Sequence, residues 1–126
     1  MRVLLDTVTF LFASDTPERL SHRARSVLGD SGNIRELSVL SFSEIALKNA
    51  LGKLAMDRER ALVAVGDLQL QILSYLPEHA LRLFDLPLHH KDPFDRQLIA
   101  QALTENIPVV TCDERFALYK GLRVIW

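Results

Sequence analysis

The sequence predicts an α/β fold, a sandwich of helices around a mostly parallel β-sheet. Short apolar runs typical of buried strands alternate with longer segments at helical spacing. The chain has 126 residues, which is enough for one domain over residues 1–126 and short for two. Hydrophobic residues make up 48% of the chain and charged residues 25%, so a disordered chain is excluded.

The first half of the chain predicts two strands and four helices. Residues 3–5 form a buried apolar strand, which Asp6 ends. Helix caps and turn residues define the elements that follow. In order these are a short helix over 7–13, a helix over about 22–29 after Ser21, a strand over 37–40, a helix from a capping-box spacing at Ser41 and Glu44 to about Gly52, and a helix from Asp57 to about 68.

The second half predicts three further strands, each preceded by a helical segment. Prolines and glycines mark the boundaries. In order we expect a strand over 71–76, a helix from Pro77 to about 85, a loop over 87–91, a helix over 94–106 started by Asp92 and Pro93, a strand over 108–111, a helix from Asp113 to 119 and a last strand over 124–125.

Charge and cysteine content limit the classes of function. Fifteen Lys and Arg against sixteen Asp and Glu give a net charge of −1, so any basic surface for a nucleic acid must be local. A single cysteine, Cys112, excludes an internal disulfide and multi-cysteine zinc modules. The N-terminus makes a poor signal peptide and no apolar run is long enough to span a bilayer. We therefore expect a cytoplasmic protein with no membrane partner.

Four acids are placed where a parallel α/β sheet binds its ligands, beyond the carboxyl ends of the strands. Asp6 ends the first strand, Asp113 follows the strand over 108–111, and Glu44 comes four residues after Leu40. Asp95 lies in the first turn of its helix on the same stripe as the apolar residues, so it points inward.

Each acid also has an ordinary structural interpretation. Asp113 could be an N-cap, Glu44 could complete a capping box, Asp95 could favour the positive end of its helix, and Asp6 could merely end a strand. Four acids on one rim are harder to explain in this way, because carboxylates held together must keep protons or gather around a cation. Oxygen ligands without cysteine suit Mg²⁺ or Mn²⁺, and phosphodiester hydrolysis is the chemistry that such ions support.

Four short motifs in this order resemble a PIN-domain ribonuclease, most of all the VapC type of toxin from type II toxin–antitoxin systems. They are LLDT at 4–7, SFSEIA at 41–46, DPFDR at 92–96 followed by LIA at 98–100, and VTCD at 110–113. The resemblance covers essentially the whole chain. It implies a PIN-like three-layer sandwich with a five-stranded parallel sheet, and a Mg²⁺- or Mn²⁺-dependent endoribonuclease that leaves a 5′-phosphate and a 3′-hydroxyl.

The resemblance also implies roles for individual residues. Asp6, Glu44, Asp95 and Asp113 match its acidic catalytic and metal-site positions. The three aspartates would be the nearer ligands, and Glu44 would hold a second metal or orient the attacking water. Thr111 matches a supporting hydroxyl that could bond a carboxylate or metal-bound water.

Partners follow from the same resemblance. The substrate would be RNA, and a small cognate antitoxin would hold the toxin inactive. An antitoxin Arg or Lys placed among the acids could substitute for the charge of the cation. A homodimer that assembles with antitoxin into a larger complex is also expected.

Several residues near the acids remain open to two interpretations. Arg96 and Lys48 could contact RNA phosphate, but Arg96 could be an ordinary solvated residue and Lys48 could form a helix ion pair with Glu44. His89 and His90 are interpreted as loop residues that could touch RNA rather than as metal ligands, because two adjacent side chains rarely face one ion.

Two other classes of function are compatible with acids at strand ends. A receiver-like signalling domain also binds Mg²⁺, although it needs paired acids after the first strand, where Asp6 stands alone before Thr7. A non-catalytic binding module could keep the PIN fold without the activity. Metal binding and RNA cleavage distinguish these alternatives from a nuclease.

Overall fold

Five parallel strands form the centre of the molecule. The computed structural model describes residues 1–126. The strands are β1 (Arg2–Leu5), β2 (Ile34–Ser38), β3 (Gln71–Leu73), β4 (Val109–Val110) and β5 (Val124–Ile125). They pair in the order β3-β2-β1-β4-β5 and all pairs are parallel, which confirms the predicted α/β fold. Strand β1 is the central strand, so its carboxyl end lies between the carboxyl ends of β2 and β4.

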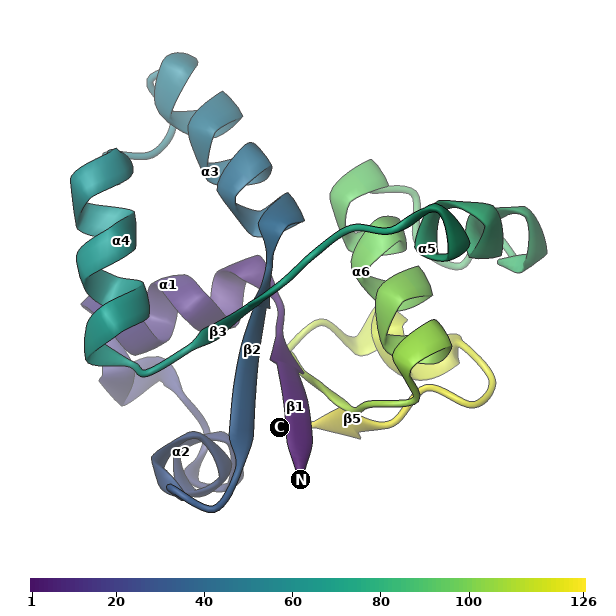
Figure 1. Cartoon of the computed structure of the whole chain (residues 1–126), viewed down its shortest axis with the longest axis horizontal. Coiled ribbons are helices and arrows are strands. Elements are labelled where there is room, and N and C mark those ends of the chain that lie inside the picture. The colour runs from purple at the N-terminus through teal and green to yellow at the C-terminus, as the bar shows by residue number, and fades with distance from the viewer.

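Helical segments connect successive strands (Figure 1). The α-helices are α1 (Thr7–Asp15), α2 (His22–Gly29), α3 (Val39–Ala50), α4 (Arg58–Asp67), α5 (Pro77–Arg82) and α6 (Pro93–Glu105). Three short 3-10 helices complete the chain: η1 (Pro17–Arg19), η2 (Leu83–Asp85) and η3 (Glu114–Leu118). None of the helices has the length and apolar character needed to cross a membrane.

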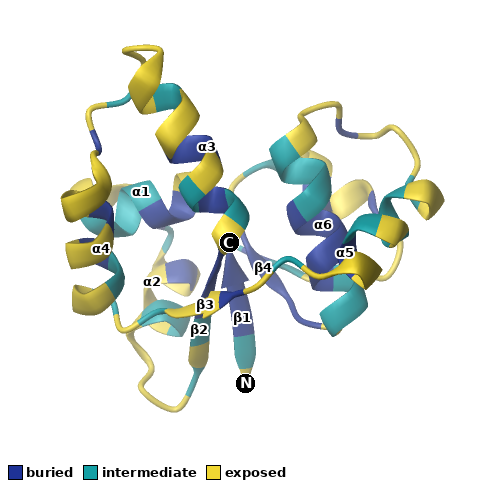
Figure 2. Ribbon diagram, turned by 45° about the horizontal axis from the view of Figure 1, so that its top comes forward, coloured by how far each residue is buried: buried dark blue, intermediate teal, exposed yellow.

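Different helices cover the two faces of the sheet. Successive side chains of a strand point to opposite faces, so neighbouring residues of β1 pack against different helices. Leu4 packs with Leu98 and Ile99 of α6. Leu5 packs on the other face in a cluster with residues of α1, α3 and α4, and Val3 packs there with residues of η1–α2. Figures 1 and 2 show α6 on one side of β1 and α1, α2 and α4 on the other. The result is a three-layer sandwich.

The junction of β2 and α3 differs from the predicted strand over 37–40 and helix start at Ser41. Ser38 is the N-cap, because its hydroxyl accepts a hydrogen bond from the Leu40 N–H at 3.1 Å. A short apolar run does not distinguish the end of a buried strand from the first turn of a helix. Because this cap lies three residues before Ser41, Glu44 lies inside the helix and does not complete a capping box with Ser41.

Two other boundaries also differ from the sequence predictions. The predicted strand over 71–76 ends at Leu73, and the Ser74 carbonyl accepts a hydrogen bond from Gln101 Nε2 at 3.2 Å instead of continuing the sheet. The helix predicted from Asp113 to 119 is the 3-10 helix η3, which Asp113 caps. Both corrections lie in short segments where side-chain contacts outweigh local propensity.

A polar network ties α5 and α6 to the sheet. Arg2 of β1 donates two hydrogen bonds to Glu36 of β2, at 2.8 and 3.0 Å, and one to Glu105 at the end of α6, at 3.1 Å. Buried His79 of α5 bonds the same Glu105 through Nε2 at 3.1 Å.

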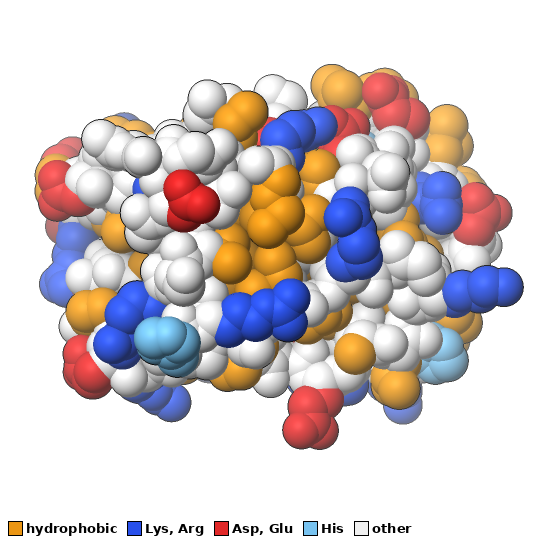
Figure 3. Space-filling view, turned by 90° about the horizontal axis from the view of Figure 1, so that it is seen from below, with side chains coloured by type: hydrophobic (Ala, Val, Ile, Leu, Met, Phe, Trp, Pro, Cys, Tyr) orange, Lys and Arg blue, Asp and Glu red, His pale blue; other side chains and the backbone are white.

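On the face seen from below in Figure 3, acidic side chains are scattered rather than gathered. The acids singled out by the sequence lie instead beyond the carboxyl ends of the strands.

Candidate metal centre

Asp6 comes directly after β1 and is the N-cap of α1. Its Oδ1 accepts a hydrogen bond from the Thr9 N–H at 2.8 Å, and its Oδ2 accepts one from Thr111 Oγ1 at 2.6 Å. The side chain is buried. Burial raises the pKa of Asp6 although these hydrogen bonds act to lower it. The two hydrogen bonds fix the orientation of the carboxyl group. A nearby cation would favour its ionised form.

Asp113 follows β4, and four nitrogen atoms lie within hydrogen-bond distance of its carboxylate. Its Oδ1 accepts from the backbone N–H of Arg115 at 3.0 Å, and the Arg115 guanidinium donates to both carboxylate oxygens at 3.0 and 2.9 Å. His90 Nε2 lies 2.9 Å from Oδ2. Burial acts to raise the pKa of Asp113, but the hydrogen bonds from Arg115 and His90 outweigh it and lower this pKa to about 2. Asp113 is thus ionised at neutral pH.

Asp95 lies in the first turn of α6, which Asp92 caps through the N–H groups of Phe94 and Asp95 at 2.9 and 3.0 Å. Asp92 as the N-cap and Pro93 as the first residue of the helix thus start α6, as the sequence predicts. Burial raises the pKa of Asp95, and the charges of Asp92, Asp6, Glu44 and Asp113 raise it further, to about 7. These four acids act on Asp95 because they surround it.

Glu44 reaches the same region from α3. The side chain is buried, its Oε2 accepts a hydrogen bond from Lys48 Nζ at 2.7 Å, and its Oε1 is buried without any hydrogen-bond partner. An unpartnered buried carboxylate oxygen is costly. Oε1 therefore has a free acceptor position that a cation or a metal-bound water would satisfy.

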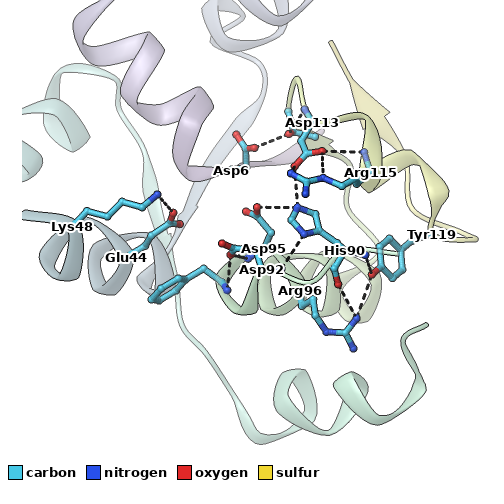
Figure 4. A network of polar contacts seen from close by, with 12 residues as sticks. Asp6, Glu44, Lys48, His90, Asp92, Asp95, Arg96, Asp113, Arg115 and Tyr119 are labelled. Carbon is cyan, nitrogen blue, oxygen red and sulfur yellow. Dashed lines mark hydrogen bonds and ion pairs between the residues drawn. The ribbon is translucent and has the colours of Figure 1, made fainter. Parts of the chain in front are cut away.

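Figure 4 shows Asp6, Asp95 and Asp113 pointing toward one another, with Glu44 and Lys48 across the space from α3. The four sequence-predicted acids thus come from four separate segments to one end of the sheet. His90 joins two of these acids, because ligand atoms of His90, Asp95 and Asp113 lie within 4.8 Å of one another. Oxygen-rich donors and the free Glu44 Oε1 fit a hard divalent ion such as Mg²⁺ or Mn²⁺.

The residues expected to touch RNA lie in different environments. Lys48 forms the ion pair with Glu44 described above, and His89 is exposed, with its ring 5.1 Å from that of Tyr119. Arg96 does not point freely into solvent, because its guanidinium donates to the carbonyls of Leu86, Pro87 and His90 and to the Tyr119 hydroxyl. His90 is buried and lies inside the acidic group.

Arg115 is a member of the site that the sequence analysis does not single out, although its position two residues after Asp113 is a signal that it can reach that carboxylate. His90 is expected from the sequence as a loop residue that could touch RNA. The structure turns its ring inward against Asp95 and Asp113, which its neighbours along the chain do not reveal.

Comparisons with known proteins identify the family and the fold of the chain. The PIN domain family model matches residues 3–122. VapBC2 from Rickettsia felis, solved bound to a DNA fragment from its promoter, is similar over 98% of this chain and 97% of the other, with 14% identity and a TM-score of 0.73. DNA-bound VapBC from Salmonella typhimurium is similar over 98% and 96%, with 20% identity and a TM-score of 0.71. FitAcB from Neisseria gonorrhoeae is similar over 97% and 95%, with 20% identity and a TM-score of 0.58.

These solved structures share the fold at low identity, and no curated protein matches the chain significantly. The family match covers nearly the whole chain and includes all four acids. A receiver-like signalling domain is therefore the wrong interpretation. The order of the strands agrees, because flavodoxin-like sheets place the first strand between the second and third, whereas here β1 lies between β2 and β4. This chain belongs to the PIN domain family.

Proposed function

We propose that this chain is a VapC-type toxin, an endoribonuclease that uses Mg²⁺ or Mn²⁺ to hydrolyse RNA phosphodiester bonds. The observation that carries the proposal is the convergence of Asp6, Glu44, Asp95 and Asp113 on one end of the sheet, where burial and, after it, the charges of the neighbouring acids raise the pKa of Asp95 to about 7. Such repulsion disappears when the acids share a divalent cation.

In this proposal Asp6, Asp95 and Asp113 hold the ion. The chemistry supplied by a bound divalent ion is polarisation of a phosphoryl oxygen and activation of water near neutral pH. Thr111 keeps the Asp6 carboxylate oriented through its 2.6 Å hydrogen bond. Glu44 Oε1 has no competing donor, so it can orient the attacking water or bind a second ion. Hydrolysis then leaves a 5′-phosphate and a 3′-hydroxyl.

RNA as the substrate is supported by the cations at the rim of the site. Arg115 and Lys48 each pair with one of the acids, and both side chains are about half exposed, at 57% and 44%. Either can bind a phosphate when an ion takes over the neutralisation of its acid. This supplies the local basic surface that a net charge of −1 does not supply overall.

A protein antitoxin is the proposed partner. A further similar solved structure, VapBC-5 from Mycobacterium tuberculosis, is described as a member of the VapBC family of toxin–antitoxin systems, and the Rickettsia felis and Salmonella typhimurium structures carry the same VapBC name. A surface that such a partner could cover lies between α3 and α4, where a cavity of about 460 Å³ is lined mainly by apolar side chains, including Phe42, Ile45 and Leu62. We further propose that the toxin forms a homodimer in the cytoplasm and assembles with antitoxin into a larger complex.

Cleavage of total cellular RNA by the purified chain tests the proposed activity. With Mg²⁺ or Mn²⁺ we expect discrete fragments with 5′-phosphate ends, and mapping them identifies the target. Asp95→Asn should abolish cleavage while the protein stays folded, whereas Asp67→Asn, an exposed acid of α4, should cleave like wild type. Equal cleavage by Asp95→Asn, or none by wild type with either ion, contradicts the proposal, and the second result favours a non-catalytic binding module.

A further inference from the structure

The tautomer of His90 is fixed by its own loop. The imidazole is buried, at 1% exposure, and its Nδ1 accepts a hydrogen bond from the backbone N–H of Asp92 at 3.1 Å. A ring nitrogen that accepts a hydrogen bond carries no proton, so the proton of the neutral ring is on Nε2. His90 therefore presents an N–H donor, and not a lone pair, on its Nε2 side.

This N–H faces two acids from different parts of the chain. Nε2 is hydrogen-bonded to Asp113 Oδ2 at 2.9 Å and lies 3.0 Å from Asp95 Oδ2 (Figure 4). No other ion pair or hydrogen bond involves the Asp95 carboxylate. His90 is thus the group that joins the two carboxylates in the absence of an ion.

We propose that His90 is a positioning residue, which aligns Asp95 and Asp113 for metal binding through its Nε2–H and does not itself bind the metal. The inference rests on the proposed metal-dependent function. Binding through Nε2 would require the proton to move to Nδ1, where it would meet the Asp92 N–H, donor against donor. The proximity of His90, Asp95 and Asp113 therefore indicates a metal site with two of the three as ligands and the third behind them.

The loop around His90 is held by contacts that keep the ring in this orientation. The Tyr119 hydroxyl accepts a hydrogen bond from the backbone N–H of His90 at 2.9 Å and donates one to the Pro87 carbonyl at 2.9 Å. Arg96 donates to the carbonyls of Pro87 and His90 at 2.8 and 3.3 Å. Phe116 packs edge-on against the imidazole, with ring centroids 5.7 Å apart. Arg96, expected to touch RNA, thus acts here through the position of His90.

Two substitutions separate the donor from the bulk of the side chain. His90→Gln can keep an N–H near the position of Nε2, whereas His90→Leu fills the space without a donor. We expect His90→Leu to weaken Mn²⁺ binding, measured by the EPR signal of free Mn²⁺, by about tenfold to a hundredfold. His90→Gln should stay within about threefold of wild type, and His22→Leu, at an exposed histidine of α2, should bind like wild type.

The thermal midpoint without metal, measured for the same proteins, separates positioning from general destabilisation. In the proposal, the Mn²⁺ affinity of His90→Gln stays close to that of wild type even if its thermal midpoint is as low as the thermal midpoint of His90→Leu. Wild-type affinity in His90→Leu overturns the inference while leaving the metal site intact. Failure of wild type to bind Mn²⁺ is a different result, which rejects the proposed function and the inference together.

A direct view of the ring nitrogens decides the matter even if His90→Leu fails to fold. The chain has four histidines, and the His90→Gln spectrum assigns the His90 signals in ¹⁵N-labelled protein. We expect an unprotonated Nδ1 and a protonated Nε2 at neutral pH, with or without saturating Mg²⁺. Loss of the Nε2 proton on addition of Mg²⁺, or a protonated Nδ1 in its absence, shows a different role and overturns the inference.

Discussion

The Thr111 hydroxyl donates a 2.6 Å hydrogen bond to Asp6 Oδ2 and joins residues 105 positions apart in the sequence. Both lie just beyond the ends of neighbouring strands, β1 and β4, whose register pairs Leu5 with Val110. The parallel pairing therefore brings the acid and the hydroxyl together. The same Thr111 oxygen accepts a hydrogen bond from the Asp113 N–H at 3.0 Å, so one side chain helps to position two of the proposed metal ligands.

Replacement of Thr111 should weaken both stability and metal binding. Thr111→Val leaves Asp6 Oδ2 buried without its donor, so we expect the free energy of unfolding in urea to fall by about 1–3 kcal/mol. Mn²⁺ affinity should fall as well, because the carboxylate loses its orientation. Thr111→Ser keeps the hydroxyl and serves as the matched control. A Thr111→Val protein with wild-type stability and affinity contradicts the role given to this hydrogen bond.

Asp95 should make the metal-free protein less stable as pH rises. Its pKa is about 7 in the folded chain against 3.8 for an ordinary aspartate, so between these values the folded state holds a proton that the unfolded state has released. The unfolding free energy therefore falls from about pH 4 to about pH 7 and then levels off, by on the order of 4 kcal/mol at most. The raised pKa of Asp6 acts in the same direction.

Urea unfolding in EDTA between pH 5 and pH 8 measures this dependence. Asp95→Asn removes the titrating group, so its stability should vary less over the same range. The raised pKa of Asp95 is contradicted if the unfolding free energy of wild type is the same at pH 5 and pH 8. It is also contradicted if this free energy rises between the two pH values by more than that of Asp95→Asn.

Removal of Arg115 should strengthen metal binding. Its guanidinium pairs with Asp113 Oδ2 at 2.9 Å and competes electrostatically with a cation. Because the side chain is exposed, the effect of Arg115→Gln on Mn²⁺ affinity should not exceed about fivefold. Arg23→Gln, at an exposed arginine of α2, is the control. Weaker Mn²⁺ binding by Arg115→Gln in a calorimetric titration would show that Arg115 supports the ion instead of competing with it.

The network under α5 should affect stability without affecting the metal site. His79 is fully buried, its Nδ1 accepts from the Leu76 N–H at 3.0 Å, and its Nε2 bonds Glu105. His79→Leu leaves the Leu76 N–H without a partner, and we expect a loss of about 1–3 kcal/mol in urea unfolding. Mn²⁺ affinity at a temperature where the protein is folded should not change. A large loss of affinity would mean that the site depends on α5.

The positions of Asp6 and Asp113 were predictable because each follows a short apolar strand, and parallel strands end at one edge of a sheet. Asp95 was predictable from its place on the inward stripe of a regular helix. The start of α3 was not predictable, because an apolar run suits the end of a strand and the first turn of a helix equally. The N-cap at Ser38 determines where the helix begins.

The place of His90 was beyond local sequence patterns. Its ring turns inward because Arg96 and Tyr119 bind the carbonyl and amide groups of a loop without repetitive structure, and these residues are distant or irregularly spaced in the sequence. Tertiary contacts of this kind, rather than propensity, also give Arg96 its structural role.

The central claim is that carboxylates from separate segments of the chain share one divalent ion. Crystals grown with Mn²⁺ test it most directly, through an anomalous difference map recorded at the manganese absorption edge. The account predicts a peak bound by oxygens of Asp6, Asp95 and Asp113, with His90 Nε2 outside the coordination sphere. A fully occupied Mn²⁺ elsewhere on the surface, with these carboxylates still held only by His90, Arg115 and Thr111, would contradict it.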